Sequence, residues 1–286
     1  MEILQFIGYG NMAQAILEGS HEILSKRFIL EITGRNPEKI APFLQEKNIQ
    51  AQIVPYKDAI DIHQKFVFLL FKPYNLKDFN YQGQAQSVLS ALAGVDFEAL
   101  SNAINSLHYL KCMPNIASKF ALSSTAVCEK SPMPLISQKA LSVIESFGNC
   151  VRVGNEEQVD ASIATNGSAL AFLSLVASGL KDAGIREGLN ARDSLELVKM
   201  SFKGFAKLLE KERPEMIIDQ ICTPKGATIE GLSVLEKKGV RGAFIKACHE
   251  SVKKMHPKNH TLKKQRDTFR QTEFRKSQAF DPKRSD

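Results

Sequence analysis

The sequence contains no tryptophan and few residues that could form disulfides or bind metal ions. Its 286 residues include 5 cysteines, an odd number, and no two have the C-x-x-C spacing (Cys112, Cys128, Cys150, Cys222 and Cys248). We therefore expect reduced thiols and a cytoplasmic location, with neither a disulfide framework nor a zinc site. The 6 histidines are dispersed, apart from three near the C-terminus, so we predict no metal site.

Long hydrophobic runs are lacking as well. The most apolar window, residues 163–180, is interrupted by polar residues (Thr165, Asn166, Ser168, Ser174 and Ser178). A membrane-spanning helix needs about 20 mostly apolar residues, so we expect no membrane span. The first predicted strand begins at residue 2, where a signal peptide would begin, so we also expect no leader.

Surplus charge is absent from most of the chain. Residues 253–286 contain 11 Lys and Arg against 4 Asp and Glu, so this tail carries the whole net charge of +7. A basic tail can bind nucleic acid or an anionic surface, or it can be a solvated, partly disordered extension. Aromatic residues are sparse there, which favours the second interpretation. We therefore expect neither a nucleic-acid nor a membrane partner.

The N-terminal segment contains the most informative pattern that is present. Apolar residues from Ile3 to Ile7 predict a strand, a glycine turn follows at residues 8–13, and helical spacing comes next. In this context G-x-G-x-x-A is typical of a dinucleotide site. Gly8 allows a tight turn, Gly10 lets the backbone approach a pyrophosphate, and the helix N-terminus favours its negative charge. An ordinary strand–loop–helix with two turn glycines is the alternative.

A second predicted strand, residues 28–33, is not followed by an acidic residue. In NAD-binding folds an acid at this place binds the ribose 2′-hydroxyl. Arg35 and Asn36 stand there instead, and a guanidinium suits a 2′-phosphate. We therefore predict NADPH as the cofactor, with NADH as the alternative. The other interpretation is a turn arginine that contacts only solvent.

Short apolar strands alternate with helical segments through the first half of the chain. The uninterrupted apolar run at residues 66–71 is typical of a parallel strand that is buried on both faces. It ends at Lys72-Pro73, where ligands of open α/β sheets bind. We predict the α/β class, with a Rossmann-type, doubly wound, mostly parallel sheet as the dinucleotide-binding domain over residues 1–154.

Predicted strands cease after Gly154, and five helical segments follow (residues 156–182, 191–211, 214–221, 227–238 and 242–255). Apolar helices with so few polar breaks often bury one face against a partner subunit. We predict an all-helical substrate and dimerisation domain over residues 155–252, followed by the basic extension at residues 253–286.

Several motifs occur together in one order: Gly8 to Ala13, Phe71-Lys-Pro73, Ser90-Ala-Leu-Ala-Gly94, Met113-Pro-Asn115, Asn166 to Ala171, Asp182 to Leu189 and Thr223-Pro-Lys-Gly-Ala-Thr228. With these motifs, residues 1–252 resemble pyrroline-5-carboxylate reductase, the last enzyme of proline synthesis. The final three are more specific than the glycine turn, and their spacing makes coincidence improbable.

The resemblance implies NADPH-dependent reduction of L-1-pyrroline-5-carboxylate to L-proline by hydride transfer to the C=N bond. It also implies a homodimer or larger homo-oligomer with its active site between subunits. The cofactor's phosphates would be bound at the glycine turn and after the second strand, and its nicotinamide end at two later loops (Gly8, Tyr9, Gly10, Asn11, Met12, Arg35, Asn36, Lys72, Pro73 and Asn115).

The substrate's carboxylate needs an anion site. Free N–H groups around Gly226, Ala227 and Thr228, where a loop enters a predicted helix, can supply one. The resemblance implies that Thr228 faces the pyrroline nitrogen of the neighbouring subunit, as hydrogen-bond partner or proton donor. An ordinary first-turn threonine is the alternative, and Lys225 either attracts the carboxylate or contacts solvent.

The chain departs from the family pattern in three places. Ile116-Ala117 replaces Thr-Pro, Ala169-Leu170 replaces Gly-Pro, and Lys225 replaces the first of two glycines. These changes keep two other functions open. One is a related NADP-dependent oxidoreductase for another small imine or keto acid, and the other is a non-catalytic, NADP-binding regulatory homologue.

Overall fold

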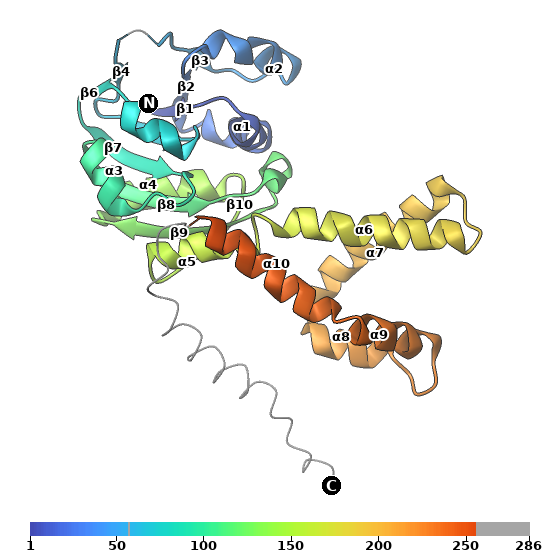
Figure 1. Cartoon of the computed structure of the whole chain (residues 1–286). Helices are drawn as coiled ribbons and strands as arrows, with labels where there is room; N and C mark the ends of the chain where they lie inside the picture. The colour runs from blue at the N-terminus through green and yellow to red at the C-terminus, as the bar shows by residue number, and fades with distance from the viewer. Residues whose placement is uncertain (57, 256–286) are drawn as a thin grey trace.

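A computed structural model describes residues 1–56 and 58–255 of the chain. An eight-stranded sheet forms its N-terminal region (Figure 1). The strands are β1 (Glu2–Ile7), β2 (Phe28–Thr33), β3 (Gln52–Ile53), β5 (Phe66–Leu69), β7 (Ala85–Ser90), β8 (Ser106–Met113), β9 (Ser123–Lys130) and β10 (Gly148–Arg152). A second, two-stranded ladder pairs β4 (Ile60–Asp61) with β6 (Tyr81–Gln82).

The sheet order is β10-β9-β8-β7-β5-β1-β2-β3. Every neighbouring pair is parallel except β8 and β9, which are antiparallel. The direction of strand addition reverses at β1, which pairs with β2 on one side and β5 on the other. Ligands of such sheets bind at this switch point, beyond the carboxyl ends of the strands. The predicted doubly wound, mostly parallel fold is therefore confirmed.

Helices cover both faces of the sheet because its strands are apolar on both sides. Phe66 and Phe68 belong to one buried cluster and Val67 and Leu69 to the other, as expected for alternating side chains. The first cluster is completed by α1 (Asn11–Leu24), η1 (Pro37–Ile40), α2 (Ala41–Glu46) and α4 (Pro134–Glu145). The second includes residues of η2 (Pro73–Asp78) and α3 (Phe97–Ala103).

The C-terminal region is helical. It consists of α5 (Glu156–Ala161), η4 (Ser162–Ala164), α6 (Ala169–Arg186), α7 (Ala191–Leu209), α8 (Pro214–Ile221), α9 (Ala227–Lys237) and α10 (Val240–Met255). We call α6 to α10 the helical arm, because these helices extend away from the sheet in Figure 1. The arm returns to the sheet at its end: a Cβ on Gly94, in the loop after β7, would lie 2.7 Å from the Met255 carbonyl oxygen.

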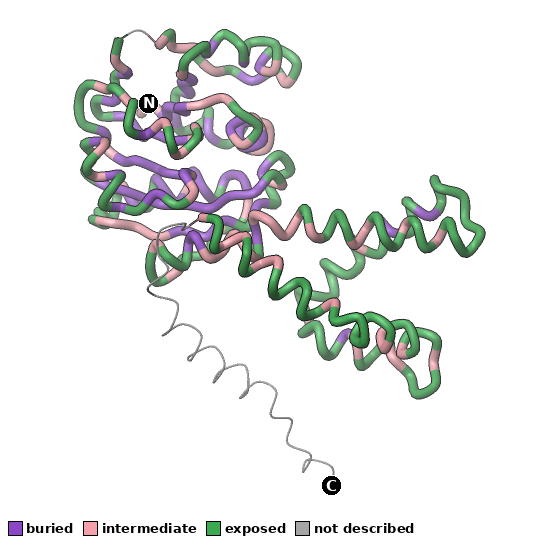
Figure 2. The backbone as a smooth tube through the Cα atoms, viewed as in Figure 1, coloured by how far each residue is buried: buried purple, intermediate pink, exposed green. Residues whose placement is uncertain are grey.

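Burial differs sharply between the two regions, as Figure 2 shows. The interiors of the central strands are buried, whereas α6, α9 and α10 contain no buried residue. Within the arm only Ser194, Val198 and Ile217 are buried. The arm therefore has almost no interior within one chain.

The single helix predicted over residues 156–182 is wrong. The chain forms α5 and η4, turns at residues 165–168, and begins α6 at Ala169. Asn166 lies in this turn, where its side-chain amide bonds to main-chain carbonyls of the sheet. A non-local contact therefore overrides the local helical pattern.

Candidate active site

The glycine turn lies at the carboxyl end of β1, next to the switch point. Gly8 has a φ of 107°, and a Cβ there would lie 2.8 Å from the Leu70 carbonyl carbon. The Gly8 N–H donates to the Thr33 carbonyl at 2.9 Å. The backbone therefore requires glycine at this position, because β1 passes so close to the loop after β5.

Gly10 has a different role from Gly8. It is the N-cap of α1, and a Cβ built on it would meet no atom within 4 Å. The first turn of α1 has no side-chain cap and no acidic residue. The open space at Gly10 and the unpaired N–H groups at the start of α1 therefore fit a pyrophosphate, which is the group that the sequence motif predicts.

Arg35 lies beyond the end of β2, beside the glycine turn. Its Nη2 donates to the Oδ1 of Asn75, on η2, at 2.8 Å. The intervening Gly34 is close to the Tyr9 ring, since a Cβ there would lie 3.0 Å from the ring edge. The predicted residues Tyr9, Arg35 and Asn36 thus belong to the same edge as Gly8 and Gly10.

The two later loops also leave the carboxyl edge of the sheet. Lys72 precedes η2 as its N-cap, and Pro73 is the first residue of η2. Asn115 follows β8 and caps η3 (Ile116–Phe120), with its Oδ1 accepting from the Ala117 N–H at 3.0 Å. Its Nδ2 donates to the Asn166 carbonyl at 3.4 Å. Because both polar groups of Asn115 have partners in the protein, this side chain holds the loop in shape.

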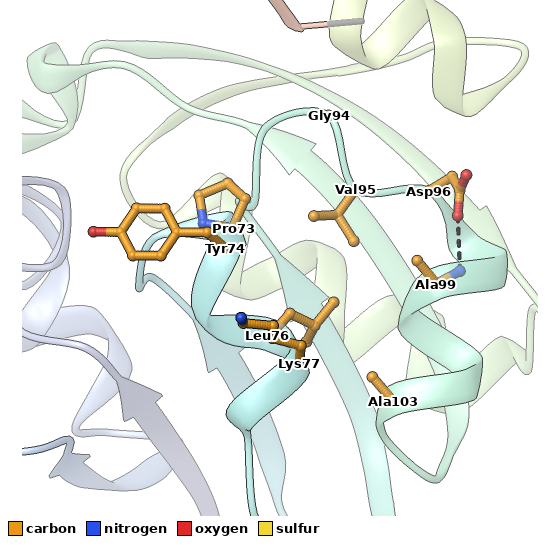
Figure 3. Close-up of a pocket in the computed structure, with 9 residues that line it drawn as sticks. All are labelled: Pro73, Tyr74, Leu76, Lys77, Gly94, Val95, Asp96, Ala99 and Ala103. Carbon is orange, nitrogen blue, oxygen red and sulfur yellow. Dashed lines mark hydrogen bonds between the residues drawn. The ribbon is translucent and has the colours of Figure 1, made fainter. Parts of the chain in front are cut away.

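A pocket of about 580 Å³ lies between η2 and α3, beside the predicted nicotinamide edge (Figure 3). It shares Pro73 with the predicted cofactor residues but includes no residue of the glycine turn. Its lining is mainly apolar, and the Asp96 carboxylate in its wall accepts the Ala99 N–H as the N-cap of α3. This pocket is therefore separate from the pyrophosphate position.

Thr228 lies far from the glycine turn of its own chain. It is the second residue of α9, which lies in the helical arm away from the sheet (Figure 1). Gly226 is the N-cap of α9, and Gly226, Ala227 and Thr228 all precede or form its first turn. The structure thus brings the predicted cofactor residues to one edge and leaves the predicted substrate residues elsewhere.

Lys225, which departs from the family pattern, adopts a backbone conformation that glycine reaches more easily. Its φ is 59°, in the left-handed region that favours glycine. The Gly226 N–H donates to the Thr223 carbonyl at 2.9 Å, which closes a tight turn in front of α9. Lysine therefore occupies a position that glycine, the residue of the family pattern, would adopt with less strain.

A buried ion pair joins the sheet to the helical region. Lys111 on β8 and Asp160 on α5 lie 2.6 Å apart, with side-chain exposures of 1% and 3%. The second carboxylate oxygen of Asp160 accepts the Gly94 N–H at 3.4 Å. The sequence motifs include neither Lys111 nor Asp160, and they do not point to Asn75. No sequence pattern links these two residues, and their pairing becomes evident only when β8 and α5 are seen packed together.

Burial shifts the pKa of three titratable side chains of the sheet region. Burial raises the pKa of the Cys112 thiol, and it raises the pKa of Cys150 to about 11. Burial also lowers the pKa of His108, which lies 2.9 Å from Glu129. Among residues 1–56 and 58–255, no group of three or more His, Cys, Asp or Glu could hold a metal ion.

Comparison with protein families divides the chain into two matched parts. Residues 3–94 match the family described as NADP oxidoreductase, coenzyme F420-dependent. Residues 156–257 match the family described as pyrroline-5-carboxylate reductase dimerisation. The second match assigns the helical arm to subunit pairing and supports a homo-oligomer.

The same match bears on the apolar segment that begins the helical region. By length and composition alone, the segment Glu156–Arg186 could cross a membrane: its most apolar 18-residue window has a mean hydropathy of 1.5, and 6% of that window is buried within the chain. The expectation that its polar residues alone exclude a span is therefore too strong. This segment lies inside the dimerisation match, which gives its exposed apolar residues another partner.

Solved structures share the fold. A 1-pyrroline-5-carboxylate reductase from Streptococcus pyogenes superposes with a TM-score of 0.75 at 24% identity, covering 88% of this chain and 97% of that one. A pyrroline carboxylate reductase from Plasmodium falciparum, solved with NADP bound, gives a TM-score of 0.70 at 21% identity, covering 88% and 97%. At these identities the likeness shows the architecture.

Sequence relatives are far more similar. A pyrroline-5-carboxylate reductase from Helicobacter pylori strain J99 is 95% identical over 255 residues, which are 89% of this chain and 99% of that protein. A second, from Helicobacter pylori strain 26695, is 94% identical over the same coverage. Identity at this level extends over both the sheet region and the helical arm, and the chain belongs to the pyrroline-5-carboxylate reductase family.

Proposed function

We propose that the chain reduces L-1-pyrroline-5-carboxylate to L-proline with NADPH as the hydride donor. The observation that carries this proposal is the 95% identity with a pyrroline-5-carboxylate reductase over almost the whole of that relative. Bound NADPH supplies a hydride to the ring carbon of the C=N bond, and a proton goes to the ring nitrogen. The residues bind and orient the reactants and supply that proton.

The carboxyl edge of residues 1–154 is the proposed cofactor site. Gly8 to Met12 hold the pyrophosphate with main-chain N–H groups, and Arg35 with Asn36 pairs with the 2′-phosphate. Lys72, Pro73 and Asn115 border the nicotinamide. Support comes from the open space at Gly10 and from the position of Arg35 on the same edge.

Residues 155–252 form the proposed substrate and dimerisation domain. Gly226, Ala227 and Thr228 of the partner subunit hold the substrate's carboxylate on the N–H groups at the start of α9. The Thr228 hydroxyl, which is exposed, faces the ring nitrogen as hydrogen-bond partner or proton donor. Support comes from the distance of α9 from its own sheet and from the dimerisation match.

The departures from the family pattern bear on substrate choice. Ile116 is 50% exposed at the cofactor edge, so its bulk borders the space for a small ring. Lys225 is exposed beside the proposed carboxylate site and brings a positive charge there. Reduction of another small imine or keto acid is therefore the second candidate. Scattered free thiols support a cytoplasmic location for either enzyme.

An NADPH-oxidation assay with a panel of substrates tests the proposal. We expect turnover with L-1-pyrroline-5-carboxylate to exceed that with other cyclic imines and with keto acids. Preference for another member of the panel would replace the proposed substrate. NADPH binding without turnover of any member would indicate the non-catalytic regulatory homologue.

A further inference from the structure

The antiparallel ladder between β8 and β9 ends beside Asn115, one of the proposed cofactor residues. The last registered pair is Met113 with Ala126, and Pro114 follows, which has no N–H to continue the ladder. The next N–H, that of Asn115, donates to the Ser123 hydroxyl at 3.0 Å. The Met113 and Ser124 carbonyls lie at this end of the ladder.

Asn166 supplies a donor to both carbonyls from the helical region. Its Nδ2 donates to the Met113 carbonyl at 2.7 Å and to the Ser124 carbonyl at 2.9 Å. Its own carbonyl accepts from the Asn115 side chain at 3.4 Å. The side chain of Asn166 therefore bridges the ends of two strands, and its main-chain carbonyl bonds to the loop that follows β8.

The surroundings of Asn166 fix this arrangement. The residue is 6% exposed, and its Oδ1 has no hydrogen-bond partner among the described residues. Because both N–H donors point at carbonyl oxygens, turning the amide over would place oxygen against oxygen. The residue also marks the turn between η4 and α6, where the helical arm begins. The turn that leads into the arm is therefore hydrogen-bonded directly to Asn115.

We propose that Asn166 is a positioning residue for hydride transfer, which holds the Met113–Asn115 loop in the place where it orients the nicotinamide. This proposal rests on the proposed function, since it requires the nicotinamide end to lie at that loop. Asn166 acts through Asn115 and the strand ends without contacting either reactant. Small displacements of reacting atoms are costly, and about 1 Å can reduce the rate by about 100-fold.

The test substitutes Asn166→Ala and measures kcat per NADPH-binding site together with the primary deuterium isotope effect from NADPH labelled at the transferred hydrogen. We expect kcat to fall about ten-fold, the isotope effect to rise, and the Kd of NADPH to stay within about two-fold, because a misplaced nicotinamide slows the chemical step and leaves the phosphate contacts intact. Counting bound NADPH removes unfolded protein from the comparison.

Asn155→Ala is the matched control. Asn155 caps α5 by accepting the Gln158 N–H at 2.9 Å, and it lies in the same part of the chain. Its loss should lower stability without changing the isotope effect. Asn166→Ser keeps one hydroxyl donor and should give an intermediate kcat, and it decides the question if the alanine variant does not fold.

Two results would overturn the proposal. One is an Asn166→Ala enzyme with the wild-type kcat per site, and the other is a fall in kcat with an unchanged isotope effect. A wild-type enzyme that does not turn over L-1-pyrroline-5-carboxylate would instead overturn the proposed function, and the role of Asn166 with it.

Discussion

The sheet region and the helical arm are similarly rich in apolar residues but use them differently. In the sheet region Leu4, Phe6 and Phe68 are 0% exposed, because helices cover both faces of the sheet. In the arm Leu175 is 73% exposed and Met200 is 62% exposed. Exposed apolar residues on such helices can form one side of a hydrophobic core whose other side comes from a partner. The sheet region buries its apolar residues within one chain, whereas the arm can bury its own only against a second chain.

We expect the largest loss of activity from a charge placed among the exposed apolar residues of the arm. Leu175→Glu on α6 should prevent dimer formation and abolish turnover, because it places a charge in the proposed subunit interface. The sheet region should remain folded and bind NADPH. Sedimentation measures the oligomeric state, and fluorescence titration measures NADPH binding.

Leu135→Glu is the matched control for that experiment. Leu135 is 75% exposed on α4 of the sheet region, almost the same as Leu175. A glutamate in the first turn of α4 suits the helix dipole, so oligomer and activity should persist. If both variants dissociate, or neither does, the difference drawn between the two regions is wrong.

The next effect concerns the junction between the regions. Asp160→Ala leaves the Lys111 ammonium buried without its carboxylate, and the free energy of unfolding should fall by about 3–5 kcal/mol. Replacing both partners, as Lys111→Met with Asp160→Leu, should recover part of this loss. Urea denaturation measures the change. Glu236→Ala, which removes an exposed partner of Arg241 in the arm, should change stability little; an equal loss there would contradict the assignment.

Thr228 provides the sharpest test of what the arm contributes to catalysis. Thr228→Ala should lower kcat/KM about 100-fold if the hydroxyl assists proton transfer, with NADPH binding unchanged. A purely structural threonine predicts a stability loss of about 0.5–2 kcal/mol and an intact kcat. Steady-state kinetics and thermal unfolding on the same preparation separate these outcomes. Unaltered turnover would leave only the main-chain N–H groups of α9 to hold the substrate.

Arg35 provides the corresponding test for the sheet region. Arg35→Ala should raise the KM for NADPH about ten-fold or more and leave that for NADH nearly unchanged, because one charge-assisted contact contributes roughly 1.5–3 kcal/mol. The ratio of the two KM values is the measurement. A parallel rise for both cofactors would show that Arg35 does not read the 2′-phosphate.

The smallest effect is expected from the basic tail, most of which lies outside the described residues. Ending the chain after Met255 removes most of the surplus positive charge and keeps the contact with Gly94. Fold, oligomeric state and turnover should persist. Loss of any of them in the shortened chain would mean that the tail is a packed element.

The sequence predicts the parts of the site that local rules control. The turn at Gly8 and Gly10 follows from glycine chemistry and strand–turn–helix spacing, and the reversal of strand order follows from alternating strands and helices. The missing acid after β2 points to Arg35. Each of these signals lies within a few residues of the feature that it predicts.

The parts that were missed depend on residues far apart in the chain. Strands β9 and β10, with α4 between them, were not predicted, because β9 pairs antiparallel with β8 and its eight residues end in polar ones. The Asn166 side chain donates to the Met113 carbonyl, 53 positions away. This contact interrupts the helix that the local sequence pattern predicts over residues 156–182. Lys111 and Asp160 are 49 positions apart. Local patterns contain no information about such pairings.

The return of α10 to Gly94 places both ends of the helical arm beside the sheet region. The arm leaves the sheet region at α5 and comes back beside it at Met255, and Cys248 donates to the Ala164 carbonyl at 3.3 Å on the way. Two points of attachment restrain the helical arm more than one would, because they oppose twisting as well as bending. We therefore expect the sheet region and the helical arm of one chain to move together as a single body.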